Sequence, residues 1–220
     1  MSKPKLYGIP GSRALRSIWA IEEVGIDYEL VPTHFMGDSK KPEYLAINPN
    51  GRIPTLVDGD LTLFESMAIN LYLAKTYRGD LYPESPADEA RAWQWSIWGL
   101  TELEPHLMEM VLHKVMFPEE RREPARVVAA EKAMDRPLKV LEAHLSDRDH
   151  VLGDAFSIVD LNVAAVLSMS SMVGYEGVAN YPKVAAWLAA ARGRPAFARA
   201  QAASGRRGAR AWGTLGRGAP

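Results

Sequence analysis

Hydrophobic and polar residues follow one pattern in the first third of the chain and another in the rest. Residues 5–9 and 28–31 are short apolar runs that predict strands. Between them, apolar residues recur at helical spacing and predict a helix over 12–24: Leu15, Ile18, Trp19 and Ile21. Gly25 follows as a stop signal.

A hairpin and a helix complete this first region. Residues 55–57 and 61–64 flank an Asp58-Gly59 turn, which is a strong hairpin signal. A short helical turn is expected at 43–46, before the hairpin, and a longer helix at 66–77, after it. The resulting order, βαβ then ββα, predicts a small α/β domain with a mixed sheet, over residues 1–80.

The rest of the chain is predicted to be all-helical. Residues 81–87 are rich in proline and polar residues and predict a linker. Long helical patterns with little strand signal then fill a second domain, expected over 88–203: 89–116, 125–145, 158–172 and 183–192. Two prolines inside these patterns predict breaks or kinks: Pro105 and Pro137.

Composition narrows the class of protein. The chain has 220 residues, 47% of them hydrophobic, and a net charge of -1, which argues against a general nucleic-acid binder. No apolar run approaches the roughly 20 residues that cross a bilayer, and the first residues do not resemble a secretory signal. We therefore expect a cytoplasmic protein that does not enter a membrane.

The chain contains no cysteine. Disulfides, thiolate metal sites and a cysteine nucleophile are therefore excluded. If thiol chemistry takes place here, a small molecule must supply the thiol.

The last residues, 204–220, carry four arginines, five glycines and no acid. Without this tail the net charge is -5. So polar a segment cannot bury much surface, and we expect a mobile end rather than a binding element for an acidic partner.

The stretch NPNGRIPTLVDGDLTLFES, residues 48–66, contains two features that turn chemistry does not explain. The first is Pro54, which lacks an N–H and stands where a strand begins. It forces Ile53 towards an extended conformation, so an extended peptide could pair with the Ile53 backbone. A cis Ile53–Pro54 bond does not follow from the sequence, since only about 5–6% of such bonds are cis.

The second feature is the pair Glu65 and Ser66, where the hairpin meets the next helix. Ser66 is a natural N-cap residue. Free N–H groups at a helix start also bind carboxylates, and Glu65 could hold an ammonium group. The pair would then hold an α-amino acid.

Ser12 follows the tight Pro10-Gly11 turn at the start of the first helix. It can act simply as a helix cap. It also lies at the carboxyl end of a strand, where α/β sheets place their ligand sites.

Taken together, these residues resemble the glutathione transferase family. The matching segments span most of the chain: KLYGIPGS with Arg16 four residues on, NPNGRIPTL, DGDLTLFESMAI and FSIVDLNVAA. The arrangement is most similar to the serine-type members, in particular the phi and theta groups. The resemblance implies a thioredoxin-like N-terminal domain, an all-helical C-terminal domain and a homodimer.

The resemblance also implies a site for the co-substrate glutathione, without a metal. Ser12 matches the hydroxyl that faces the sulfur. The backbone of Ile53, before a cis Pro54, is implied to pair with the cysteinyl part. The matching positions for the rest of the tripeptide are Ser39, Lys40, Arg52, Glu65 and Ser66.

Some residues depart from the family pattern or carry weaker hypotheses. Ser39 stands where a histidine is frequent, and Arg13 adds a cation next to Ser12; whether Arg13 or Arg16 assists the thiolate stays open. Tyr7 is expected to pack at the domain boundary. Candidates for the electrophile pocket are Arg13, Phe35, Met108 and Leu112.

The helical half offers two other candidates, which we interpret as structural. His106 and His113 have no third partner for a metal. Ser157 and Asp160 form a capping box at a helix start, so Asp160 is not expected to be a catalytic acid.

The preferred function is conjugation of the glutathione thiolate to hydrophobic electrophiles. Two alternatives stay open at this point. One is a glutathione-dependent isomerase, dehalogenase or ether-cleaving lyase on the same fold. The other is a non-enzymatic protein that binds glutathione or apolar ligands.

Overall fold

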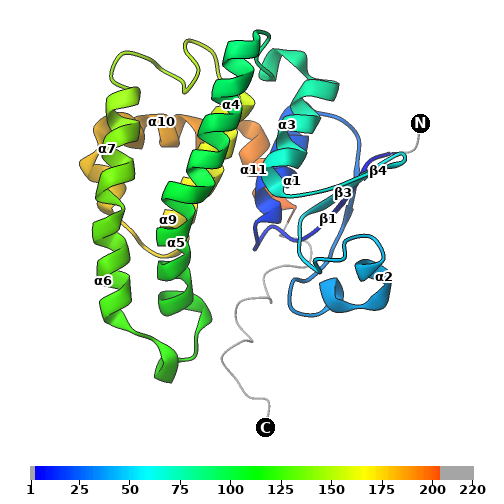
Figure 1. The fold of residues 1–220 in the computed structure, drawn as a ribbon, viewed down its shortest axis with the longest axis horizontal. Coiled ribbons are helices and arrows are strands. Elements are labelled where there is room, and N and C mark those ends of the chain that lie inside the picture. The colour runs from blue at the N-terminus through cyan, green and yellow to red at the C-terminus, as the bar shows by residue number, and fades with distance from the viewer. Residues whose placement is uncertain (1–2, 204–220) are drawn as a thin grey trace. The chain divides into compact units, whose positions relative to one another are not determined.

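The structure, a computed structural model, describes residues 3–203, which fall into two units (Figure 1). One unit comprises residues 3–82 and 194–203, and the other comprises residues 83–193. The basic tail predicted at 204–220 lies outside the described residues.

The first unit is built on a four-stranded mixed sheet. Its strands are β1 (Lys5–Tyr7), β2 (Glu29–Val31), β3 (Thr55–Asp58) and β4 (Leu61–Phe64). They lie in the order β2-β1-β3-β4; β1 is parallel to β2 and antiparallel to β3, which is antiparallel to β4. The prediction of a mixed-sheet α/β domain is confirmed.

The described part of the first unit contains four α-helices, and all but the last lie where the hydrophobic pattern predicted a helix. They are α1 (Ala14–Val24), α2 (Pro42–Leu45), α3 (Ser66–Tyr77) and α11 (Pro195–Ala202), with the 3-10 turns η1 (Asp38–Lys40) and η2 (Gly79–Leu81). α1 and α3 pack side by side (Figure 1). Their inner residues join the sheet in one core, which includes the fully buried Leu6, Ile18, Leu56 and Ile69. Gly25 ends α1 with φ 77, as its stop signal predicted.

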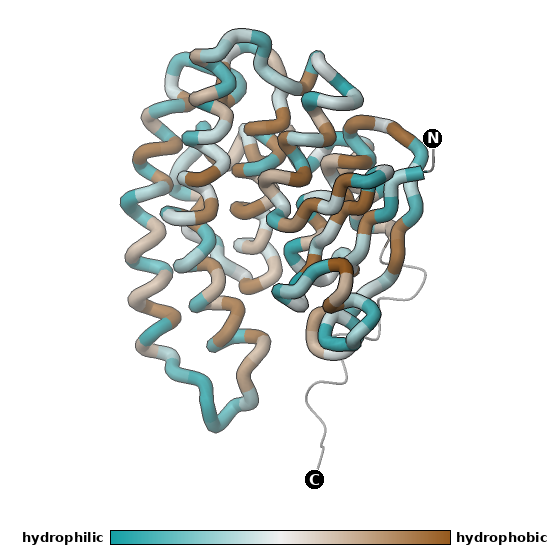
Figure 2. The backbone as a smooth tube through the Cα atoms, turned by 45° about the vertical axis from the view of Figure 1, so that its right-hand side comes forward, coloured by the Kyte–Doolittle hydropathy of each residue, from teal (hydrophilic) through white to brown (hydrophobic). Residues whose placement is uncertain are grey.

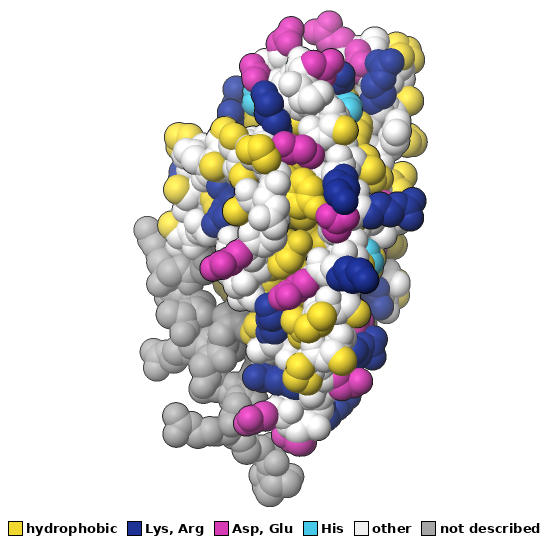
Figure 3. All heavy atoms as spheres, turned by 90° about the vertical axis from the view of Figure 1, so that its left-hand side faces the viewer, with side chains coloured by type: hydrophobic (Ala, Val, Ile, Leu, Met, Phe, Trp, Pro, Cys, Tyr) yellow, Lys and Arg dark blue, Asp and Glu magenta, His cyan; other side chains and the backbone are white. Residues whose placement is uncertain are grey.

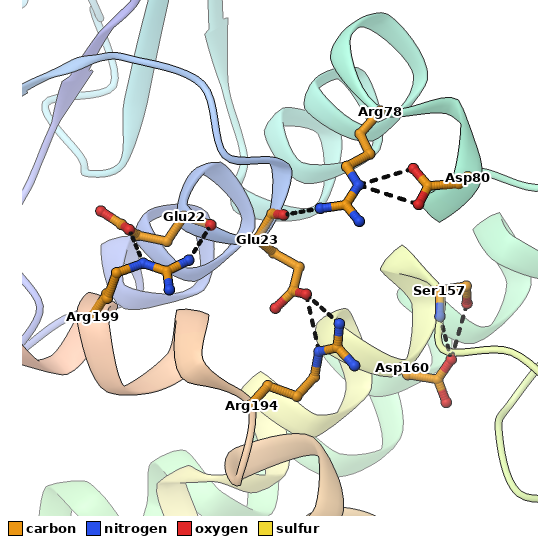
Figure 4. Close-up of polar contacts among 8 residues, drawn as sticks. All are labelled: Glu22, Glu23, Arg78, Asp80, Ser157, Asp160, Arg194 and Arg199. Carbon is orange, nitrogen blue, oxygen red and sulfur yellow. Dashed lines mark hydrogen bonds and ion pairs between the residues drawn. The ribbon is translucent and has the colours of Figure 1, made fainter.

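The last helix, α11, packs on α1, although the sequence analysis placed its residues in the helical domain and predicted no helix there. The Trp19 and Phe197 rings lie 4.6 Å apart. Arg199 donates to the Glu22 carboxylate at 2.7 Å, and Arg194 pairs with Glu23 (Figure 4). Arginines are favourable at this end of α1 because the helix dipole is negative there.

The second unit is helical. Its elements are α4 (Pro86–Trp98), the π-helical turn η3 (Gly99–Leu103), α5 (Glu104–Val111), a second π-helical turn η4 (Leu112–Met116), η5 (Glu119–Arg121), α6 (Pro124–Ala133), α7 (Asp135–His144), α8 (Ile158–Leu167), α9 (Met169–Met172), η6 (Gly177–Asn180) and α10 (Pro182–Arg192). Irregularities occur near Pro105 and Pro137 as predicted: Pro105 directly follows the start of α5 after the π-helical turn η3, and Pro137 lies in the first turn of α7.

Helix α8 forms the centre of the second unit, since all ten of its residues are buried. The surrounding helices alternate hydrophobic and hydrophilic residues along their turns (Figure 2). The outer surface carries acidic and basic side chains interspersed with apolar ones (Figure 3). Positive and negative side chains are therefore mixed on this face, and neither sign dominates it.

Asp160 caps the start of α8, as the sequence predicted. Its carboxylate accepts hydrogen bonds from the Ser157 N–H and hydroxyl, both at 3.0 Å (Figure 4). It also accepts from the Val151 N–H and the Trp187 indole, both at 2.8 Å. Burial opposes ionisation of Asp160, but the hydrogen bonds from these groups and the His150 ring, 3.6 Å away, outweigh it and hold the pKa of Asp160 below its ordinary value.

Asp160→Asn is expected to lower the free energy of unfolding at neutral pH by about 1–3 kcal/mol, because buried donors lose a charged acceptor. The folded-state pKa of Asp160 is lowered, so its contribution is complete above the unfolded pKa of about 3.9. It is lost as pH falls through the folded-state pKa. Denaturant unfolding of both proteins should therefore show a stability gap that closes in acid.

The matched control is Asp154→Asn, which changes an exposed carboxylate in the same loop. It should leave stability nearly unchanged. Equal stability of Asp160→Asn and the unmutated protein at pH 7 would contradict the role given to Asp160.

Candidate functional site

One row of paired residues brings the predicted site segments to the same end of the sheet. Tyr7, at the end of β1, pairs with Val31 on one side and with Thr55 on the other, and Thr55 pairs with Phe64. The residues that follow Tyr7, Val31 and Phe64 and those that precede Thr55 therefore leave the sheet together. Three strand spacings measure about 14 Å, and an extended tripeptide of about 10 Å fits within that width.

The turn after β1 holds Ser12 at the start of α1. Gly8 donates to the Val31 carbonyl at 3.1 Å, which ties the turn to β2. The Ser12 hydroxyl donates to the Ile9 carbonyl at 2.6 Å and accepts from the Ala14 N–H at 3.1 Å. Ser12 is half-buried and caps an N–H of α1, although the residue at the N-cap position itself is Arg13.

Arg13 and Arg16, the two cations considered beside Ser12, differ in exposure. Arg13 is exposed, immediately after Ser12. Arg16 is only 3% exposed, and its backbone carbonyl accepts from Asn70 of α3 at 3.4 Å. Arg16 therefore belongs to the packing between α1 and α3.

The loop before β3 presents Ile53 and Pro54. The Ile53–Pro54 bond is cis, as the resemblance implied and the sequence alone did not. Lys40 donates to the Gly51 carbonyl at 2.6 Å, so its ammonium lies beside this loop. The Arg52 side chain is exposed, and within residues 3–203 it makes no hydrogen bond or ion pair.

Glu65 and Ser66 join β4 to α3 in an unusual backbone conformation. Glu65 has φ 72 and ψ 114, and it is the single described residue other than glycine with positive φ. Such a conformation costs about 1–3 kcal/mol and is frequent at functional sites. The prediction that Ser66 is the N-cap was wrong, because Glu65 occupies that position and Ser66 is the first helical residue. Ser66 is 5% exposed.

Comparison with known proteins identifies the family. Residues 2–75 match the glutathione S-transferase N-terminal domain, and residues 103–195 match the glutathione S-transferase C-terminal domain. The chain belongs to the glutathione S-transferase family. Its similarity to glutathione S-transferase 3 of Zea mays is 36% identity over 212 residues, covering 92% of this chain and 95% of the relative.

Solved glutathione S-transferases have the same fold. A theta class enzyme from Xanthomonas axonopodis pv. citri, with glutathione bound, has 32% identity and a TM-score of 0.83. The match covers 91% of this chain and 97% of that one. A glutathione transferase from Burkholderia graminis has 30% identity and a TM-score of 0.84, over 94% of this chain and 90% of that one.

Two residues singled out in the sequence, Ser39 and Tyr7, contact neighbouring residues of the first unit in this glutathione S-transferase. Ser39 is fully buried, and its hydroxyl donates to the Phe35 carbonyl at 2.9 Å. The Ser39 hydroxyl is therefore used within its own loop, and contact of Ser39 with glutathione stays a prediction. Tyr7 packs edge to face on Tyr44 in the first unit, with ring centroids 5.9 Å apart, and its packing at a domain boundary stays a prediction.

The pocket candidates lie in both units. Phe35 is half-buried and stacks on His34, with ring centroids 4.7 Å apart. Met108 of α5 and Leu112 of η4 are half-buried in the second unit. Among residues 3–203 no cluster of three metal-ligating side chains occurs, and no helix in this range has the length and apolar character to cross a membrane.

Three polar residues behind the Ile53 loop were not predicted as functional from the sequence: Tyr44, Asn48 and Thr55. Asn48 and Thr55 are fully buried, and Tyr44 is 5% exposed. The sequence signal for these residues was Asn48, a polar residue that precedes Pro49. It was not decisive, because an asparagine side chain at this position could equally stabilise a surface turn.

Gly8→Ala should disturb the turn that holds Ser12. A Cβ on Gly8 would lie 2.3 Å from the Ala14 Cβ, so the turn and α1 would have to separate. We expect a loss of about 1–3 kcal/mol in the free energy of unfolding. Gly79→Ala is the matched control, because a Cβ there meets no atom within 4 Å. Equal stability of the two variants would show that the turn is not tightly packed.

Proposed function

We propose that the protein is a glutathione transferase in which Ser12 stabilises the thiolate of glutathione for attack on hydrophobic electrophiles. The observation that carries the proposal is the register that brings Ser12, Ile53 and Ser66 to one end of the sheet, in a chain of this family. Each of these residues lies in a segment that joins a strand at the row of paired residues Tyr7, Thr55 and Phe64.

Charge complementarity supports the placement of the tripeptide. Glutathione carries one ammonium and two carboxylates at neutral pH. In the proposed complex, Glu65 holds the ammonium, and the Ser66 hydroxyl and N–H hold the adjacent carboxylate. Lys40 and Arg52 hold the glycine carboxylate. The Lys40 ammonium donates to the Gly51 carbonyl, so it lies beside the segment that contains Arg52.

Ser12 supplies a hydrogen bond to the sulfur. Lowering a thiol pKa from about 8.5 by about 2 units requires about 2.7 kcal/mol of preference for the anion. One hydrogen bond to a charged group supplies about 1.5–3 kcal/mol. The Ser12 hydroxyl would turn its proton from the Ile9 carbonyl to the sulfur while still accepting from Ala14. Serine acts here as a donor, so its own pKa need not change.

The electrophile is proposed to be hydrophobic because each unit, taken by itself, contains half-buried apolar candidates: Phe35 in the first, and Met108 and Leu112 in the second. Arg13 is exposed beside Ser12 and adds a cation at this position. The thiolate attacks an electrophilic carbon and a carbon–sulfur bond forms. In a substitution, the bond from that carbon to the leaving group breaks and the leaving group departs with the electron pair. In an addition, the π bond of the electrophile breaks and the resulting carbanion takes a proton from water.

Ser12→Ala is expected to bind glutathione but to lose most of the lowering of the bound thiol pKa. The measurement is thiolate absorbance of bound glutathione against pH, in the unmutated protein and the variant. We expect the apparent thiol pKa to rise by about 1–2 units in Ser12→Ala, in proportion to the lost hydrogen bond.

Ser85→Ala provides the matched control. Ser85 caps α4 by accepting from the Asp88 N–H at 3.0 Å, so this variant also loses a helix cap but lies in the second unit. It should lose similar stability and retain the lowered thiol pKa. An unshifted thiol in both the unmutated protein and Ser12→Ala would mean that Ser12 is only a cap, and would favour a binding protein.

A homodimer and a cytoplasmic location are also proposed, on the basis of family membership. Exposed apolar side chains suited to an interface occur on both units. Phe64 and Tyr77 belong to β4 and α3, and Trp93 and Ile97 follow one face of α4. Trp93 and Ile97 are four residues apart and are 54% and 57% exposed.

Sedimentation at micromolar concentration should show a species of twice the 24.3 kDa chain mass. Ile97→Glu is expected to shift it towards the monomer, because a buried charge at an apolar interface is costly. The matched control is Val140→Glu, which alters an exposed valine of α7 outside the proposed interface. A monomer in the unmutated protein would refute the dimer.

A further inference from the structure

A closed ring of hydrogen bonds lies behind the Ile53 loop. It joins the side chains of Tyr44, Asn48 and Thr55 to the backbone carbonyl of Arg52. Asn48 donates to the Arg52 carbonyl and to the Thr55 hydroxyl, both at 2.9 Å. Tyr44 donates to the same carbonyl at 2.6 Å and lies 2.7 Å from the Thr55 hydroxyl.

Counting protons gives every bond in this ring a direction. The Asn48 amide has two hydrogens and uses both. The Tyr44 hydroxyl has one, which the Arg52 carbonyl accepts, so the Thr55 hydroxyl must donate to Tyr44. The Arg52 carbonyl thus accepts two hydrogen bonds in the protein interior, and the three side chains use all their donors.

The fixed carbonyl determines where the next N–H points. Among the described residues the cis peptide bond is Ile53–Pro54, and the bond between Arg52 and Ile53 is trans. In a trans peptide the carbonyl and the following N–H point in opposite directions. Because the Arg52 carbonyl points into the ring, the Ile53 N–H points away from it. No described residue accepts a hydrogen bond from this N–H.

Further contacts hold the same loop. Asn50 donates its N–H to the Asn48 side-chain oxygen at 3.1 Å. Lys40 donates to the carbonyl of Gly51, whose φ is 58. Two successive carbonyls, of Gly51 and Arg52, are therefore bonded before the chain reaches Ile53, which limits the rotation of that peptide.

We infer that Tyr44, Asn48 and Thr55 are positioning residues of the glutathione site, since their ring fixes the Arg52–Ile53 peptide and presents the Ile53 N–H to the cysteinyl part of the tripeptide. This inference rests on the proposed function. None of the three side chains touches the ligand. They act through one peptide group, and the position of the sulfur relative to Ser12 depends on it.

The test compares Thr55→Val with Thr55→Ser. Valine preserves the shape of threonine but cannot take part in the ring, whereas serine retains the hydroxyl and loses only a methyl group. Thr55→Val should weaken glutathione binding, measured by calorimetry, by about 5- to 10-fold, the effect of one hydrogen bond. It should also raise the pKa of the bound thiol, measured by thiolate absorbance. Thr55→Ser should behave like the unmutated protein in both measurements.

A purely structural role predicts the opposite ranking. Serine is the poorer strand residue and leaves a small void, so Thr55→Ser would then be no better than Thr55→Val. The matched control is Asn162→Ala, which breaks a buried bond of 2.9 Å to Ser96 in the second unit. It should lose stability with no change in the dissociation constant or the thiol pKa.

The outcomes separate the inference from the proposed function. If the unmutated protein does not bind glutathione, the proposed function fails. If it binds and Thr55→Val has the same affinity and thiol pKa, the inference is overturned. Should Thr55→Val not fold, Tyr44→Phe replaces it. This substitution removes one hydroxyl and keeps the aromatic side chain that packs on Tyr7. The same weaker binding and raised thiol pKa are expected, and unchanged values would overturn the inference.

Discussion

The register in which Tyr7 pairs with Val31 and Thr55 is the constraint on which the rest of the first unit depends. It is enforced by burial, since Leu6 and Leu56 pair across β1 and β3 and are both fully buried. A shift of one residue would turn these leucines away from the core. The same shift would separate the turn that holds Ser12 from the loop that holds Pro54. The hydrophobic core therefore sets the geometry of the polar site.

The site presents backbone groups that hydrogen bonds hold in place. The Gly8 N–H donates to the Val31 carbonyl at the end of β2, and the Arg52 carbonyl accepts a hydrogen bond from Asn48. Ser66 is the first residue of α3. Glu65 shows what this arrangement costs, because its positive φ is unfavourable by about 1–3 kcal/mol. The packing of α3 against α1, in which Ile69 and Leu73 are fully buried, holds this conformation in place.

Local signals predicted the fold well where they act over a few residues. The Asp58-Gly59 hairpin, the stop at Gly25 and the capping box of Ser157 and Asp160 all occur as predicted, because each depends on neighbouring residues. The failures involve partners far apart in the sequence. Helix α11 joins α1 through contacts between residues more than 170 positions apart, such as Arg194 with Glu23.

The site shows the same division between local and distant causes. Its segments were identified from their motifs, and the resemblance implied the cis bond at Pro54. The burial of Ser39, the conformation of Glu65 and the ring around the Arg52 carbonyl were not predictable. Each depends on how a loop folds back on residues that it meets only in the finished structure, as when Asn48 meets Thr55.

This division bears on how the proposed complex would discriminate among thiols. Ile53 and Ser66 offer backbone groups that are fixed before binding, so using them costs little conformational entropy. Arg52 and Glu65 are exposed, and their long side chains lose rotamer freedom when they close on a charge. The fixed groups therefore determine where the sulfur lies, and the mobile charges mainly add affinity for the two ends of the tripeptide. A thiol without those ends would lose affinity, whereas a tripeptide that misses the Ile53 backbone would bind with its sulfur displaced from Ser12.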